Sequence, residues 1–115
     1  MDELNNEVYL ALNRAADAMV DRLFETPEYV EYLREKERIR GDEACIGKIH
    51  RFRELTYELQ CAYDNNRMHE KSRIEKECEE LGNDKRVIDY MQAEVDFIRV
   101  YQDVLKRILE RIELD

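Results

Sequence analysis

The sequence predicts an all-α fold, a helical bundle of about five helices with two long antiparallel helices that forms oligomers. Hydrophobic residues make up 43% and charged residues 41% of the chain, while three glycines and one proline leave too few turn residues for many short strands. Apolar residues recur at steps of three and four, which is the spacing of one helix face. With 115 residues, we expect a single helical domain over residues 1–115.

The first two helices are separated by a clear boundary signal. The first is amphipathic from Leu4 and is expected to end near Phe24 or Glu25. Thr26 then offers a hydroxyl for an N-cap, and Pro27 suits the first position of a second helix because the N–H that proline lacks has no partner there.

The middle of the chain predicts two further helices. Gly41 can take the left-handed conformation that ends the second helix, and Asp42 can cap the third. Asn65-Asn66 marks the end of the third helix, and a fourth helix runs on to Gly82. The third helix is predicted to carry one heptad seam, made of Cys45, Ile49, Phe52, Thr56, Leu59 and Tyr63.

The longest helix is expected from Asp84 to about Leu114. Its main seam consists of Ile88, Met91, Val95, Ile98, Gln102, Leu105, Leu109 and Ile112. A second apolar stripe consists of Val87, Phe97, Tyr101, Val104 and Ile108. Such a helix is about 45 Å long, whereas a compact domain of this size is about 30 Å across.

Part of the last helix is therefore expected to project into an oligomer. The apolar rows on the first, third and last helices are wider than a single chain can cover. The residues expected at the interface are Ile98, Tyr101, Leu105, Ile108, Leu109 and Ile112.

The charge balance excludes several classes of partner. The formal net charge is −9, and no segment is basic, so we expect no direct binding to nucleic acid, which depends on lysine and arginine neutralising phosphates. No apolar run approaches the ~18 residues of a membrane span, and the first ten residues are acidic, unlike a secretory signal. A cytoplasmic protein without membrane contact is expected.

The sequence contains no convincing catalytic or metal-binding motif. A di-iron bundle needs Glu-x-x-His pairs, but Gly47 precedes His50 by three residues and Asn66 precedes His69 by three. The histidines are therefore expected to be solvated or capping. Glu94 could be a partly buried acid or base, but pairing with an arginine of the third helix or with Arg99 is the simpler interpretation.

The three cysteines fit reduced thiols better than a disulfide framework. Cys45, Cys61 and Cys78 are odd in number and widely spaced, and none belongs to a Cys-x-x-Cys pair. No cofactor is therefore expected within one chain. A metal or cluster shared between chains stays open as an alternative, because ligands could then converge from different subunits.

A pattern of helix caps and packing residues extends over most of the chain. It consists of Leu23 with Thr26-Pro27-Glu28-Tyr29 and Tyr32; Asp42-Glu43-Ala44 with Ile49 and Phe52; Leu59-Gln60; and Leu81 with Asn83, Val87, Tyr90 and Ala93-Glu94. This pattern resembles the YlbF/YmcA/YheA family of small helical bacterial proteins. The resemblance implies an oligomer-forming cytoplasmic protein without known enzymatic activity, and it supplies no catalytic residue.

The resemblance also implies a regulatory setting. Some family members join a further protein in a complex that assists ribonuclease Y in messenger-RNA processing, and thereby influence competence, sporulation and biofilm formation. Related chains can carry a cysteine-rich tail, and the complex has been associated with iron–sulfur clusters. The printed sequence shows no such tail, so we expect no cluster here.

Three hypotheses for function follow. The first is a non-enzymatic adaptor or regulator that forms a homo-oligomer and contacts proteins related to messenger-RNA processing. The second is a chorismate-mutase-like helical enzyme, which would need cations such as Arg14, Arg22, Lys48 and Arg51 to converge on a dicarboxylate substrate. The third is a helical sensor that binds a metal or cluster through cysteines of different chains.

Overall fold

Residues 2–113 of the protein form five α-helices. The computed structural model describes residues 2–113, with side chains described from residue 5 onward. The helices are α1 (Asp2–Leu23), α2 (Pro27–Arg38), α3 (Glu43–Asp64), α4 (Met68–Gly82) and α5 (Lys85–Ile112). Residues 2–113 contain no β-strand. The all-α class and the five helices are thus confirmed; Leu114, where the last helix was expected to end, lies outside the described residues.

The predicted caps begin α2 and α3. The Thr26 hydroxyl oxygen accepts a hydrogen bond from the Tyr29 N–H at 3.2 Å, and Pro27 is the first residue of α2. Asp42 accepts a hydrogen bond from the Cys45 N–H at 3.0 Å. Each cap satisfies a backbone N–H that the first helical turn leaves without a partner.

The remaining boundaries also follow the sequence signals. Gly41 has a φ of +80°, the left-handed conformation that glycine adopts without a steric penalty, and it lies between α2 and α3. Asn66 has a φ of 54° in the turn between α3 and α4. Asp84 caps α5 by accepting a hydrogen bond from the Arg86 N–H at 3.0 Å.

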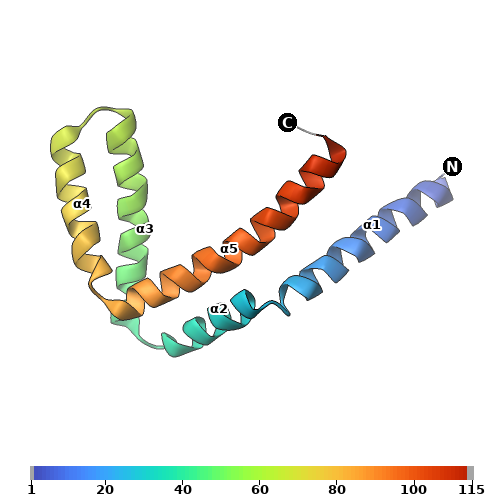
Figure 1. The fold of residues 1–115 in the computed structure, drawn as a ribbon, viewed down its shortest axis with the longest axis horizontal. Helices are drawn as coiled ribbons and strands as arrows, with labels where there is room; N and C mark the ends of the chain where they lie inside the picture. The colour runs from blue at the N-terminus through green and yellow to red at the C-terminus, as the bar shows by residue number, and fades with distance from the viewer. Residues whose placement is uncertain (1, 114–115) are drawn as a thin grey trace.

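The helices are arranged as two packed pairs and one free arm (Figure 1). α3 and α4 form an antiparallel hairpin, and α2 packs antiparallel against the first half of α5. α1 continues beyond α2 and runs opposite in direction to α5, but every side chain from residue 5 to residue 22 is exposed. The radius of gyration is 19.7 Å, against about 13 Å for a compact domain of this length.

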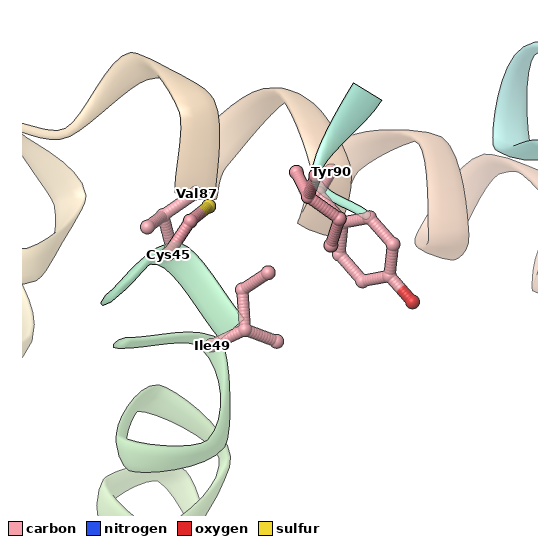
Figure 2. Close-up of a cluster of buried hydrophobic side chains, with 5 residues drawn as sticks. Cys45, Ile49, Val87 and Tyr90 are labelled. Carbon is pink, nitrogen blue, oxygen red and sulfur yellow. The ribbon is translucent and has the colours of Figure 1, made fainter. Parts of the chain in front are cut away.

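One hydrophobic core joins α2, α3 and α5. Cys45 and Val87 are fully buried, and Ile49 and Tyr90 lie beside them, as Figure 2 shows. Ile39, just after the end of α2, completes the cluster. This core fixes the point where the α3–α4 hairpin meets the α2–α5 pair.

A second core lies inside the α3–α4 hairpin and corrects the predicted seam of α3. Leu55 and Ala62 of α3 are buried there against Ile74 of α4. The seam residues Thr56 and Tyr63 are exposed instead. The reason is that α3 changes partners along its length, with its first turns facing α2 and α5 and its later turns facing α4, so the buried face does not follow one straight heptad row.

The main seam predicted for α5 is also not its buried face in the single chain. Val87, Tyr90 and Ala93 are buried against the other helices, whereas Ile88 and Val95 of the seam are exposed. Val87 belongs to the second predicted stripe. The helices of this chain therefore cover the second stripe at its start and the main seam only in part: Met91 packs against the core, whereas Ile88 and Val95 stay exposed.

A network of charged residues ties together the starts of α3 and α5. Arg86 binds Asp42 at 2.6 Å and Asp84 at 3.2 Å, while Lys48 of α3 binds Asp84 at 2.7 Å. The hydrogen bonds from Lys48 and Arg86 hold the pKa of the Asp84 carboxyl well below its usual range, because they favour its charged form. Both helix caps thereby also fix the angle between the two helices.

Candidate interaction surface

An aromatic cluster marks the place where α1, α2 and α5 diverge. Phe24, in the turn after α1, stacks on Tyr29 of α2 with ring centroids 4.5 Å apart. Tyr29 meets Phe97 of α5 at 4.9 Å, and Phe97 meets Tyr101 edge to face at 5.9 Å. Offset and edge-to-face aromatic pairs add to the energy of burial. Beyond this cluster, α1 and the end of α5 extend as separate arms (Figure 1).

The arm of α5 carries the interface residues expected from the sequence. Ile98, which follows Phe97 in the sequence, is half-buried. The other five have exposed fractions between 37% and 57%; they are Tyr101, Leu105, Ile108, Leu109 and Ile112. With Ile88 and Val95 on the same helix, they make an apolar surface that the described part of the chain leaves open. Contact between this surface and another chain stays a prediction.

α1 forms a second exposed apolar arm. None of its residues was among the expected interface residues, which all lie on α5. Its large exposed hydrophobic residues are Val8, Tyr9, Leu10, Leu12, Met19 and Val20. The sequence signal was present, because the apolar spacing of this helix was clear and its row was judged too wide for one chain. Only the structure shows that the side chains of residues 5–22 are all exposed, so that this described part of α1 is not covered by another helix of the chain.

The two arms leave the chain with far more exposed surface than its mass requires. Its accessible surface is 9252 Å², whereas a compact monomer of 14.0 kDa exposes about 6,700 Å². The excess of about 2,500 Å² is roughly three times the ~800 Å² that each partner contributes to a standard protein interface. The large apolar side chains exposed on both arms are typical of sites of interaction.

The chain was compared with known protein families, curated proteins and solved structures. A family model described as control of competence regulator ComK, YlbF/YmcA, matches residues 12–113. The chain belongs to this family. No curated protein and no solved structure matches the chain. The YlbF/YmcA match covers both the packed helices and most of the two arms, and it places the chain in a regulatory family.

In this YlbF/YmcA chain, Glu94 is part of an ion pair rather than an isolated acid. Its carboxylate accepts a hydrogen bond from the Arg53 guanidinium of α3, one of the partners expected from the sequence. The Glu94 side chain is 20% exposed, and the pair links α3 to α5 beside Tyr90. The geometry therefore supports a structural role for Glu94, as an ion-pair partner, over a role as an acid or base.

The four cations considered for a dicarboxylate site do not converge within the chain. Arg14 and Arg22 lie on the exposed arm α1. Lys48 binds Asp84 at 2.7 Å, and Arg51 binds Glu77 of α4 through two hydrogen bonds of 2.9 and 3.1 Å. The cations of α3 therefore already neutralise carboxylates that join helices.

A pocket of about 540 Å³ opens between the end of α2 and the start of α3. Ile39, Ile49 and Tyr90 line it, together with the cations Lys36, Arg40 and Arg53. Arg40 lies 3.4 Å from Glu37 and Arg53 binds Glu94, so two of these three lysine and arginine cations already face carboxylates. This leaves the pocket poorly suited to a dicarboxylate.

The cysteines and histidines lie apart from one another. Cys45 is buried, Cys61 and Cys78 are partly buried, and His50 and His69 are exposed. Burial raises the pKa of the Cys45 and Cys78 thiols, which favours the protonated form that binds metals weakly. Within the described residues, no three His, Cys, Asp or Glu side chains gather as a metal site. Nor is any described helix both long and apolar enough to cross a bilayer.

Proposed function

We propose that the chain is a non-enzymatic regulatory adaptor of the cytoplasm that forms a homo-oligomer through its two apolar arms and contacts proteins of messenger-RNA processing. Membership of a family that controls a competence regulator supports the regulatory part. The exposed apolar surface of α1 and of the end of α5 is the observation that carries the part about assembly. The link to ribonuclease Y and to biofilm control rests on the family resemblance of the sequence.

The chemistry of the chain supports an adaptor better than an enzyme. Arg51 and Arg53 of α3 each bind a carboxylate of another helix, and the partly buried candidate acid Glu94 is held by Arg53. The most buried carboxylate, Glu35, is likewise paired, with Arg38. Large apolar side chains, in contrast, are exposed on both arms. A protein that exposes this much apolar surface on its helices is suited to binding other helices.

The first experiment changes both Leu105 and Leu109 to Asp and measures the mass by sedimentation velocity. We expect the mass to move from a multiple of 14.0 kDa toward the single chain, because two charges buried in an interface cost several kcal/mol. The matched control changes Tyr57 and Met68 to Asp, two apolar residues of the α3–α4 hairpin that are equally exposed or more so. A folded Leu105/Leu109 variant of unchanged mass would remove the end of α5 from the interface.

The second experiment tests the partner. The tagged chain is expressed in its native host, and the co-purified proteins are identified by mass spectrometry. We expect a ribonuclease or its accessory proteins with the wild type. The Leu105→Asp/Leu109→Asp variant serves as a second bait and shows whether partner binding needs the assembled form. Recovery of the chain alone would contradict the link to messenger-RNA processing.

A further inference from the structure

We infer that the chain forms a symmetric dimer in which α1 of each copy packs on the second half of α5, residues 98–112, of the other copy. The inference rests on the homo-oligomer proposed above and specifies which surfaces meet. It commits to a second copy of this chain as the occupant of both apolar arms. Two lines of observation support it: the area and geometry of the arms, and their charges.

The exposed area suits a second copy. Two chains that each bury this excess of about 2,500 Å² would bury about 5,000 Å² in total, at the upper end of the range of about 2,000–5,000 Å² that is typical of obligate homodimers. Two apolar arms on one chain also offer two different contact surfaces. In a two-fold symmetric dimer, an α1 to α5 contact occurs twice, so both arms of both chains are covered by one operation.

The turn between α1 and α2 opposes the alternative in which α1 folds back on its own α5. The Thr26 hydroxyl donates a hydrogen bond to the Leu23 carbonyl at 2.7 Å while it caps α2. The Phe24 N–H donates to the Val20 carbonyl at 3.0 Å, and the Phe24 ring stacks on Tyr29. These contacts fix the direction of α1 across a connection of three residues, from Phe24 to Thr26. Closure onto its own α5 would break them.

The charges of the two arms favour contact between unlike arms. α1 carries five carboxylates and two arginines, a formal charge of −3. Residues 98–112 of α5 carry four cations and two carboxylates, a formal charge of +2. Pairing α1 with α1 or α5 with α5 would place like net charges together, whereas pairing α1 with α5 brings opposite charges to the rim of the apolar contact.

Mixing two defective variants tests this arrangement. One variant carries Leu12→Asp and Met19→Asp on α1, two exposed residues seven positions apart on one helix face. The other carries Leu105→Asp and Leu109→Asp on α5. Each variant alone should have the mass of a single 14.0 kDa chain, because both of its contacts contain a changed arm.

An equimolar mixture should recover a species of twice that mass. In the mixed dimer, the unchanged α1 of one variant meets the unchanged α5 of the other, so one of the two contacts is intact. Native mass spectrometry with a tag on one variant should show one chain of each kind. Variants that were unfolded could not restore assembly in this way, so the recovery also reports on their folding.

Several outcomes overturn the inference without touching the proposed adaptor. A mixture that stays monomeric, with both variants helical by circular dichroism, overturns the pairing of α1 with α5. Variants that each dimerise alone and do not exchange chains in the mixture indicate contacts between like arms, because each variant then keeps one unchanged contact. A Leu12→Asp/Met19→Asp variant that still dimerises removes α1 from the interface. A wild-type chain that sediments as a monomer, in contrast, overturns both this inference and the proposed homo-oligomer.

Discussion

Asp84 shows how much of the fold depends on single polar side chains. It caps α5, where it accepts hydrogen bonds from Arg86, and it also accepts a hydrogen bond from Lys48, which connects it to α3. Glu77 of α4 likewise connects two helices, because its carboxylate accepts two hydrogen bonds from Arg51 of α3. In both cases the cation lowers the pKa of the carboxyl, because the bonds favour the charged form.

These two carboxyls predict a loss of stability in acid. Since their folded-state pKa values lie below those of the unfolded chain, the stabilisation is present above about pH 4 and is lost as the pH falls through the folded-state values. We expect Asp84→Asn to reduce the difference in unfolding free energy between pH 7 and pH 3. Urea titrations at both pH values measure it. Glu80→Gln, on the exposed side of α4, is the control, and an equal reduction there would contradict the assignment to Asp84.

Thr26 allows a test of a helix cap at the base of the free arm. Thr26→Ala removes the oxygen that accepts from the Tyr29 N–H and should lower the unfolding free energy by about 1 kcal/mol. Thr26→Ser keeps the hydroxyl and should stay near the wild type. Chemical denaturation at one fixed protein concentration compares the three. Equal losses in both variants would point to the methyl group instead of the cap.

The helices as elements were largely predictable, but their buried faces were not. Cap residues and Gly41 set the boundaries locally, so the sequence signals placed all five helices. The seam predicted for α3 was wrong at Thr56 and Tyr63, which are exposed, whereas its member Leu59 packs against the buried Leu55. Periodicity identifies apolar rows, but it does not tell which row meets which helix when a helix changes partners.

A pair of neighbouring substitutions checks this correction. Leu55→Ala should lower the unfolding free energy by about 2–5 kcal/mol, because it leaves a cavity between α3 and α4. Thr56→Ala should change it by less than about 0.5 kcal/mol, because Thr56 is exposed. Urea denaturation followed by circular dichroism distinguishes them. The reverse order would restore the straight seam and refute the packing of the hairpin.

The whole molecule is defined by its two uncovered arms. One buried core joins α2, α3 and α5 and a second lies inside the α3–α4 hairpin, while α1 and the end of α5 extend away from both (Figure 1). An isolated helix of this length is only marginally stable in water without packing on its apolar face. The stability of the arms is therefore expected to depend on association.

This dependence predicts a melting temperature that rises with protein concentration. If folding of the arms is coupled to association, dilution shifts the equilibrium toward dissociated chains and lowers the melting temperature. Thermal melts over a hundredfold range of concentration should show the shift for the wild type. The Leu105→Asp/Leu109→Asp variant should melt at a constant, lower temperature. A wild-type melting temperature independent of concentration would contradict the coupling.

The sequence by itself determined the helix class, the helix boundaries and the family, because caps, turn residues and apolar spacing act over a few neighbouring positions. The pattern of caps and packing residues that resembles the family includes Thr26 and Asp42, which cap helices in the structure. It also includes Ile49, Val87 and Tyr90, which lie in the core. Only the tertiary structure decided which apolar rows the chain covers itself. It buries Val87, Tyr90 and Ala93 and leaves α1 and the end of α5 open, because that choice depends on how distant helices pack and not on any local signal.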